Sequence, residues 1–276
     1  MRRGTFCTHF GKAPFVVRHR LVAHELFSLS RLVELSKRLP LRRSSTTPAR
    51  FPSASIPPAL RATDFRQETI RRIEECRSWL VLKNVQDDPA YRLLLEDCLA
   101  EVRAAAPPLT RGMCEPRAFI FVSSPDAVTP YHMDPEENFL LQIRGSKTIS
   151  VFDPADRSIV SEPEIERFFS GAHRNLAYRD DYQRKAQLFH LRPGLAVHVP
   201  FAAPHWVRNG PAVSISFSIT FNTKASLRTL HAHRINGQLR RWGVQPTPVG
   251  RSALRDGLKQ LVARTSARAT RALGLA

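Results

Sequence analysis

Three side chains able to bind a metal ion lie in two short segments of the sequence. His132 and Asp134 belong to a His-Met-Asp run, and His205 ends the segment 200–205, Pro-Phe-Ala-Ala-Pro-His. Residues i and i+2 of an extended chain point to the same side, so His132 and Asp134 can address one point. Two imidazoles and one carboxylate that leave coordination positions free suit a non-haem Fe(II) ion. On this motif alone, an ordinary surface pair of side chains remains an open alternative.

A lysine that follows the segment of His132 and Asp134 could reach the same interior. Lys147 lies thirteen residues after Asp134, beyond an Arg-Gly-Ser turn. A strand that leaves the metal and a second strand that returns would bring Lys147 toward the same interior. A buried ammonium needs an anionic partner, because an unpaired buried charge is costly. A dicarboxylate whose keto-acid end chelates iron would provide that partner.

The elements that must position these residues change in type along the chain. Helical spacing and breaker residues predict three helices before residue 111, at 18–39, at 64–76 and from Asp88-Pro89 through 91–106. One strand is predicted at 79–82, and a Pro/Ser-rich linker near 42–58. From Arg117 onward, β-branched and apolar residues between Gly and Pro turns predict strands at 118–123, 138–143, 148–152, 195–199 and 213–221. Helical spacing returns at 252–273. Many short strands with such corners are typical of a jelly roll or barrel, so we expect a mainly β fold with flanking helices.

The positive charge of the chain lies at its two ends. The net charge is +18, of which residues 1–50 and 226–276 carry +9 each, while residues 51–225 sum to zero. Basic ends can bind nucleic acid or anionic membranes. Because no aromatic residues are interleaved with the basic ones, we favour solvated helix faces. Nucleic acid is therefore a possible partner that is not favoured, and no membrane association is expected.

The last predicted helix has an apolar stripe, which consists of Leu254, Leu258, Leu261 and Val262. We expect this stripe to be buried, either against the core or in a homodimer. The four cysteines are scattered without a Cys-x-x-Cys pair, which indicates reduced structural thiols. No apolar stretch approaches the roughly 20 residues that span a bilayer, and a cytoplasmic protein is expected.

Residues 127–154 together with 193–206 resemble the JmjC/cupin-like 2-oxoglutarate oxygenases, and most of all the asparaginyl hydroxylase type that acts on hypoxia-inducible factor. The shared features are a T-P-x-H-x-D run, an Asn six residues after the first His, a Gln four residues later, a G-x-K turn, and a P-x₄-H loop at the second His. The resemblance covers roughly residues 117–222. It implies a double-stranded β-helix (cupin) core at 112–225. The residue patterns outside the resemblance predict a helical region at 1–111 and a basic helical region at 226–276.

The resemblance also implies roles for individual residues. His132, Asp134 and His205 would hold Fe(II), while Lys147 and Thr129 would bind the distal carboxylate of the cosubstrate 2-oxoglutarate. Asn138 and Ser218 would line the same site, and no catalytic residue is predicted beyond the metal ligands. The family has a tyrosine where this chain offers Phe119 or Phe121, and an asparagine where it has Ser218.

The implied activity is that of a dioxygenase of the hydroxylase type. It would convert 2-oxoglutarate to succinate and hydroxylate a C–H bond of a protein, peptide or small molecule. The alternative is a non-catalytic cupin-fold binding or regulatory protein, because a fold does not guarantee chemistry.

Two further groups of residues admit more than one interpretation. The aromatic and basic insertion around 168–184 is either a cover over the substrate or a packed helical excursion. His198 is expected to be a packed strand residue or a pocket-wall residue rather than a ligand. His231 and His233 have the spacing of a ligand pair but no evident carboxylate partner, so we do not expect them to bind a metal.

Overall fold

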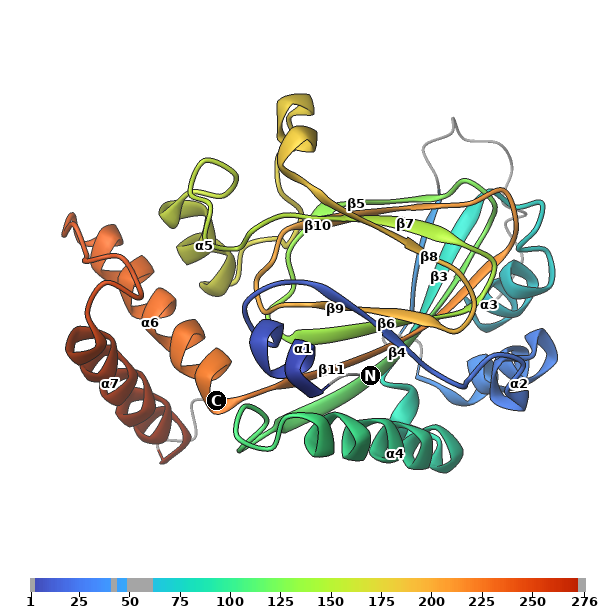
Figure 1. Ribbon diagram of the computed structural model, residues 1–276, viewed down its shortest axis with the longest axis horizontal. Helices are drawn as coiled ribbons and strands as arrows, with labels where there is room; N and C mark the ends of the chain where they lie inside the picture. The colour runs from blue at the N-terminus through green and yellow to red at the C-terminus, as the bar shows by residue number, and fades with distance from the viewer. Residues whose placement is uncertain (1–2, 41–43, 49–61, 273–276) are drawn as a thin grey trace.

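The structure is a computed structural model that describes residues 3–40, 44–48 and 62–272. Its centre consists of two antiparallel sheets that face each other (Figure 1). The larger sheet has seven strands in the order β1 (Phe15–Arg18), β9 (Leu195–Val199), β6 (Glu137–Arg144), β11 (Ser214–Asn222), β4 (Cys114–Ser123), β3 (Ser78–Lys83) and β2 (Ser44–Pro48). The smaller sheet has four strands in the order β5 (Val128–His132), β10 (His205–Asn209), β7 (Lys147–Val151) and β8 (Gln187–Leu191).

Helices cover the outer face of the large sheet. These are α1 (Arg3–His9), α2 (Leu29–Arg38), α3 (Ala62–Arg71) and α4 (Pro89–Ala105). Phe139 of β6 and Phe217 of β11 belong to the apolar core beneath them. Helix α4 starts where its sequence predicts, because the Asp88 side chain accepts a hydrogen bond from the backbone N–H of Ala90 and Pro89 occupies the first turn.

The inner face of the large sheet packs against the small sheet. Leu140 and Val197 of the large sheet form one buried cluster with Ile149 and Val207 of the small sheet. Between these apolar residues lies a polar stripe, because alternate residues of β11 are Ser214, Ser216, Ser218 and Thr220, all of them buried. The interior of the barrel is therefore apolar at its centre and lined by hydroxyl groups along one strand.

The region before residue 111 differs from the sequence prediction in two ways. It supplies three strands, β1, β2 and β3, to the large sheet, of which only β3 was predicted. The helix predicted over 18–39 is confined to Leu29–Arg38, because Ser28 caps its N-terminus and the preceding residues form a strand and a 3₁₀ turn. Of the predicted linker at 42–58, residues 44–48 form β2 and the rest lies outside the described residues.

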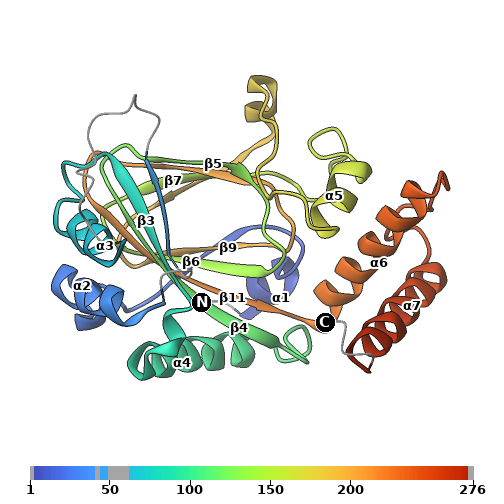
Figure 2. The same cartoon turned by 180° about the vertical axis from the view of Figure 1, so that it is seen from behind.

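The C-terminal helices pack beside the barrel (Figure 2). Helix α6 (Lys224–Arg241) contacts α5 (Glu162–Phe169), which belongs to the insertion between β7 and β8, and α7 (Ala253–Ala272) packs on α6. None of the described helices combines the length and the apolar character that crossing a membrane would require.

The apolar stripe of α7 corrects one sequence prediction. Its members are exposed rather than buried against the core, Leu254 by 76%, Leu258 by 56%, Leu261 by 59% and Val262 by 53%. The opposite, polar face of the helix is turned toward the protein. Asp256 accepts a hydrogen bond from the backbone of Gly250, and Lys259 donates one to the backbone of Thr247. Helical spacing identifies an amphipathic helix, but these polar contacts decide which face turns inward.

Candidate metal centre

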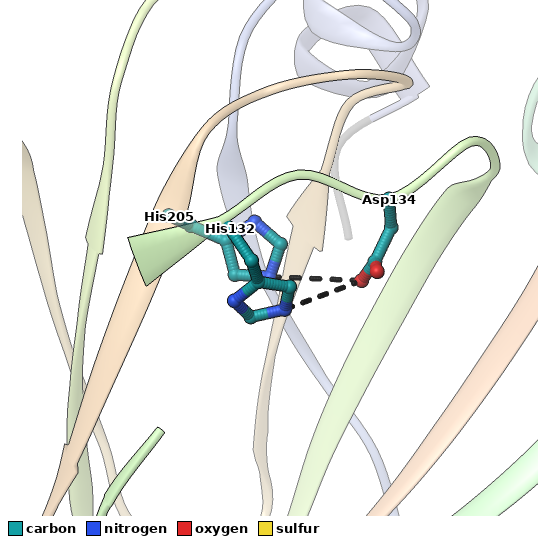
Figure 3. A group of neighbouring side chains, drawn as sticks. All are labelled: His132, Asp134 and His205. Atoms are coloured by element: carbon teal, nitrogen blue, oxygen red, sulfur yellow. Dashed lines mark ion pairs between the residues drawn. The ribbon is translucent and has the colours of Figure 1, made fainter. Parts of the chain in front are cut away.

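His132, Asp134 and His205 converge at one end of the barrel. His132 ends β5, His205 begins β10, and the two residues stand opposite each other across the paired strands. Each Nε2 lies 3.7 Å from Oδ2 of Asp134, and one donor atom from each side chain lies within 4.8 Å of the others (Figure 3). Ligand atoms about 2.0–2.2 Å from a shared ion stand at most about 4.4 Å apart, so these distances suit a single metal ion.

Backbone carbonyl groups hold both imidazoles in position. Nδ1 of His132 lies 2.7 Å from the carbonyl oxygen of Pro130, and Nδ1 of His205 lies 2.9 Å from that of Ala203. An Nδ1–H that donates to a carbonyl leaves the Nε2 lone pair free for a metal and fixes the orientation of the ring. Both rings therefore present Nε2 toward Asp134.

The charge state of the group also suits a divalent cation. Burial, and to a smaller degree the electrostatic interaction with His132, lower the pKa of His205 to about 3, so His205 is neutral at neutral pH. Burial opposes ionisation of Asp134, but His132, Arg174 and His205 hold the pKa of its carboxyl well below the ordinary value. A neutral imidazole and an ionised carboxylate are the forms that bind metal, so no proton has to leave these two ligands at neutral pH.

Arg174 contacts the other oxygen of the same carboxylate. Its guanidinium donates to Oδ1 of Asp134 over 2.8 Å. Arg174 lies in the insertion, which runs along the edge of β5: the backbone of Met133 donates to Arg174 and that of Leu176 donates to Tyr131. The insertion thus flanks the metal ligands, as a cover would. Sequence reasoning placed Arg174 among the basic residues of the insertion but did not connect it with Asp134, because no fixed spacing relates the two.

Thr129 shares the inner face with His132 because of an irregularity in β5. In a regular strand, residues three positions apart point to opposite faces. Here His132 stands opposite His205 and Thr129 opposite Val207, so β5 has one extra residue between the two pairs. This β-bulge turns both Thr129 and His132 toward the interior.

Lys147 is buried at the other end of the interior. It is 6% exposed, and alternation along β7 places it on the same face as Ile149 and Val151, which pack inside the barrel. Among the described residues, no carboxylate lies within ion-pairing distance of Lys147, and burial lowers its pKa to about 7. Val151 stands opposite His205, so the Cα of Lys147 lies about 13 Å along the strand from the level of the metal ligands.

Asn138 and Ser218 bind each other. The Ser218 hydroxyl donates to Oδ1 of Asn138 over 2.8 Å, and both side chains are buried on the inner face of the large sheet. Phe119 stands opposite Ser218, and Phe121 packs against the interior cluster. The two polar residues are thus next to the site, with one hydrogen bond already made between them.

The remaining histidines lie elsewhere. His198 is completely buried against Phe10, Phe15 and Phe139 on the outer face of the large sheet, and its Nε2 lies 2.9 Å from Oε2 of Glu137. The prediction that His198 is a packed strand residue is therefore confirmed.

His233 corrects a detail of the sequence reading. It stacks on Phe169 and does have a carboxylate nearby, since its Nδ1 is 3.8 Å from Oε2 of Glu162. Glu162 was not expected there because it belongs to helix α5, which is far from His233 in the sequence although it packs on α6. Within the described part of the chain, only His132, Asp134 and His205 form a group of three such ligands.

Comparisons with known proteins give the following matches. The family model described as a cupin-like domain matches residues 60–234. A search of curated proteins gives no match. Among solved structures, the ribosomal oxygenase YcfD from Escherichia coli, in complex with cobalt and 2-oxoglutarate, is similar with a TM-score of 0.53 and 13% identity, over 91% of this chain and 60% of that one. A second structure of YcfD gives a TM-score of 0.51 and 14% identity, over 96% of this chain and 66% of that one.

This likeness concerns the fold. The chain spans less than two thirds of the length of both YcfD chains, and the identity is low. Together with the two facing sheets, the match confirms the predicted fold, a mainly β protein with flanking helices and a double-stranded β-helix core.

Proposed function

We propose that this chain is an Fe(II)- and 2-oxoglutarate-dependent oxygenase that hydroxylates a C–H bond of a protein, a peptide or a small molecule. The chain belongs to the cupin-like domain family, which is the first ground for this proposal. The catalytic unit would be the barrel at about residues 112–225, flanked by the regions 1–111 and 226–276. The observation that carries the proposal is the convergence of His132, Asp134 and His205 at one end of an interior in which Lys147 lies buried, with no carboxylate of the described residues to neutralise it.

The residues present fit an iron ion. Two imidazoles and one carboxylate provide three ligands and leave positions open, which is the arrangement that suits non-haem Fe(II). Bound iron would supply the redox chemistry that couples O₂ to the oxidative decarboxylation of 2-oxoglutarate. The role of the chain would be to hold the ligands, to place the cosubstrate and to keep water away from the site.

Lys147 and Thr129 would hold the distal carboxylate of 2-oxoglutarate. Lys147 would pair with it electrostatically, and the Thr129 hydroxyl would donate a hydrogen bond. Both roles are supported by the inward orientation of the two side chains, one by strand alternation in β7 and the other by the bulge in β5. Because burial disfavours a charged lysine, an anion that neutralises it stabilises the occupied state. Asn138 and Ser218 would border the cosubstrate from the large sheet.

Two observations about related proteins support the proposal. YcfD shares the fold, and its structure with cobalt and 2-oxoglutarate shows that this fold accommodates a metal together with that cosubstrate. YcfD is named a ribosomal oxygenase, which is compatible with a protein substrate for this chain.

A non-catalytic binding protein is the alternative. Such a protein has no need of a buried lysine facing the metal ligands. We would measure Fe(II) and 2-oxoglutarate binding without oxygen, and then succinate formation with oxygen. Lys147→Met should abolish binding of 2-oxoglutarate and spare metal binding, whereas the matched control Lys185→Met, at an exposed lysine, should change neither. Metal binding without any 2-oxoglutarate binding by the unaltered chain would favour the alternative.

A second copy of the chain is the partner that we propose for the exposed stripe of α7. The stripe is aliphatic, and a nucleic acid offers no apolar surface of that kind, so the exposed face favours a homodimer. We further propose that the protein acts in the cytoplasm. Its four cysteines are all free thiols, which a reducing compartment maintains.

A further inference from the structure

A second lysine, Lys83, faces the interior of the barrel. Lys83 ends β3 and stands opposite Phe119 of β4, which in turn stands opposite Ser218 of β11. Residues opposed across antiparallel strands lie on the same face. Lys83 therefore shares the inner face with Ser218, while Leu80 and Leu82 of the same strand pack into the core on the outer face.

By strand register Lys83 is level with Ser218, whose hydroxyl donates to Asn138 on the inner face of the large sheet. Asn138 is the second residue of β6, which begins three residues after Asp134. Burial lowers the pKa of Lys83, and the positive charge of Arg174 lowers it further. Arg174 is itself bound to Asp134. Lys147, in contrast, lies at the opposite end of the interior.

The side chains of Arg174, Arg117 and Lys83 differ in their ion-pair partners. Arg174 pairs with Asp134 at 2.8 Å, and Arg117 lies 3.7 Å from Glu136. For Lys83, none of the described residues supplies a carboxylate within ion-pairing distance. One row further along the inner face, the hydroxyl of Thr220 is buried and has no hydrogen-bond partner among the described residues. A half-buried ammonium and an unused hydroxyl thus face the interior of the barrel.

We propose that Lys83 binds a carboxylate of the substrate. The inference rests on the proposed function, in which Lys147 holds the carboxylate of the cosubstrate at the far end. An anion beside Lys83 would offset both the cost of burying its charge and the repulsion from Arg174. The substrate is then an acidic compound, either a peptide with an acidic side chain or a free organic acid, and the same ion pair would recognise both.

The test uses the full chain loaded with Co(II) and saturating 2-oxoglutarate. Binding is measured by calorimetry for two pairs of probes, butyrate against butyramide, and a blocked Ala-Glu-Ala peptide against blocked Ala-Gln-Ala. We expect an acid of at least one pair to bind tenfold or more tightly than its amide. Lys83→Met should remove that preference, Lys83→Arg should keep most of it, and the control Lys185→Met should leave it unchanged. The pair that shows the preference identifies a free acid or a peptide as the substrate class.

Three results would overturn the inference: equal binding of acid and amide in both pairs, a preference that survives in Lys83→Met, or a loss of 2-oxoglutarate affinity in Lys83→Met as large as that in Lys147→Met. The last result would assign Lys83 to the cosubstrate site. Binding of Co(II) and 2-oxoglutarate by the unaltered chain is measured first. Their failure to bind would reject the proposed function itself, whereas normal binding without any acid preference would reject only the role of Lys83.

Discussion

Arg174 and Asp134 form an ion pair in which the guanidinium takes one carboxylate oxygen and leaves the other to face the two histidines. The oxygen Oδ1 accepts from Arg174, and Oδ2 is the atom 3.7 Å from each Nε2. The arginine therefore fixes the rotation of the carboxylate. It also connects the insertion between β7 and β8 to the metal centre.

Arg174→Met should weaken metal binding without abolishing it. Loss of a group that orients a metal ligand reduces affinity by about 10–100-fold. The measurement is a competitive Co(II) titration against a chelator of known affinity. Arg179→Met is the matched control, because Arg179 lies in the same insertion but pairs with Asp181. Equal affinities for Arg174→Met and the unaltered chain would mean that the ion pair does not position Asp134.

The affinity for 2-oxoglutarate should depend on pH through Lys147. Burial lowers the pKa of Lys147 to about 7, so above pH 7 the ligand-free protein holds this lysine mostly neutral. Binding of the distal carboxylate requires the ammonium form, and the complex must take up a proton. The observed affinity should thus fall by up to about tenfold for each pH unit above 7 and level off below it. Calorimetry in buffers of different ionisation enthalpy would detect the proton uptake.

A flat profile between pH 7 and 9 would contradict this assignment of Lys147. Lys147→Arg is the informative variant, because arginine stays protonated over the whole range. If it retains binding, its affinity should no longer decline with pH.

Glu137→Ala should destabilise the fold without altering the metal centre directly. Glu137 accepts from the buried His198 and from the backbone N–H of Phe201, on the outer face of the large sheet. Removal of the carboxylate leaves buried donors without a partner, which costs about 1–3 kcal/mol in the free energy of unfolding. Urea unfolding gives the loss of stability, and a Co(II) titration under native conditions should give an unchanged affinity. A large loss of metal affinity would show that the two faces of β6 are coupled.

Leu258→Glu should convert a dimer to a monomer. Leu258 lies in the middle of the exposed stripe of α7, and burying a carboxylate in an apolar interface is costly. Sedimentation equilibrium gives the mass of each variant. Leu93→Glu is the control, since Leu93 is an equally exposed leucine on α4. A monomeric unaltered chain at micromolar concentration would rule out the second copy as the occupant of this stripe.

Local patterns predicted those parts of the site that lie within single strands. His132 and Asp134 were recognisable because alternation places residues i and i+2 on one side. Lys147 was recognisable because the turn before it and the strand that it begins come shortly after Asp134 in the sequence. The position of His205 opposite His132 depends on the pairing of β5 with β10. The sequence indicated that His205 stands opposite His132 only through the resemblance to a family.

Features that depend on distant contacts could not be predicted in this way. The bulge that turns Thr129 inward exists only in the register between β5 and β10, and short strands such as β1 have too few residues for a pattern. Helix α6 lies in the predicted helical region at 226–276, but helical spacing did not give its bounds because its buried face includes His233 and Asn236 as well as apolar residues. Lys83 lies one residue beyond the predicted strand at 79–82, and only the sheet order reveals that its side chain faces the interior of the barrel.

Anaerobic titration of the full chain with Fe(II) and 2-oxoglutarate tests the central claim most directly. We expect one Fe(II) per chain and a visible charge-transfer band that develops only when iron and 2-oxoglutarate are both present. His132→Ala and Asp134→Ala should lose the band, and Lys147→Met should bind iron without giving it at the same concentration of 2-oxoglutarate. A chain that binds no iron, or an unaltered band in His132→Ala, would contradict the assignment of His132, Asp134 and His205 as the metal centre of an oxygenase.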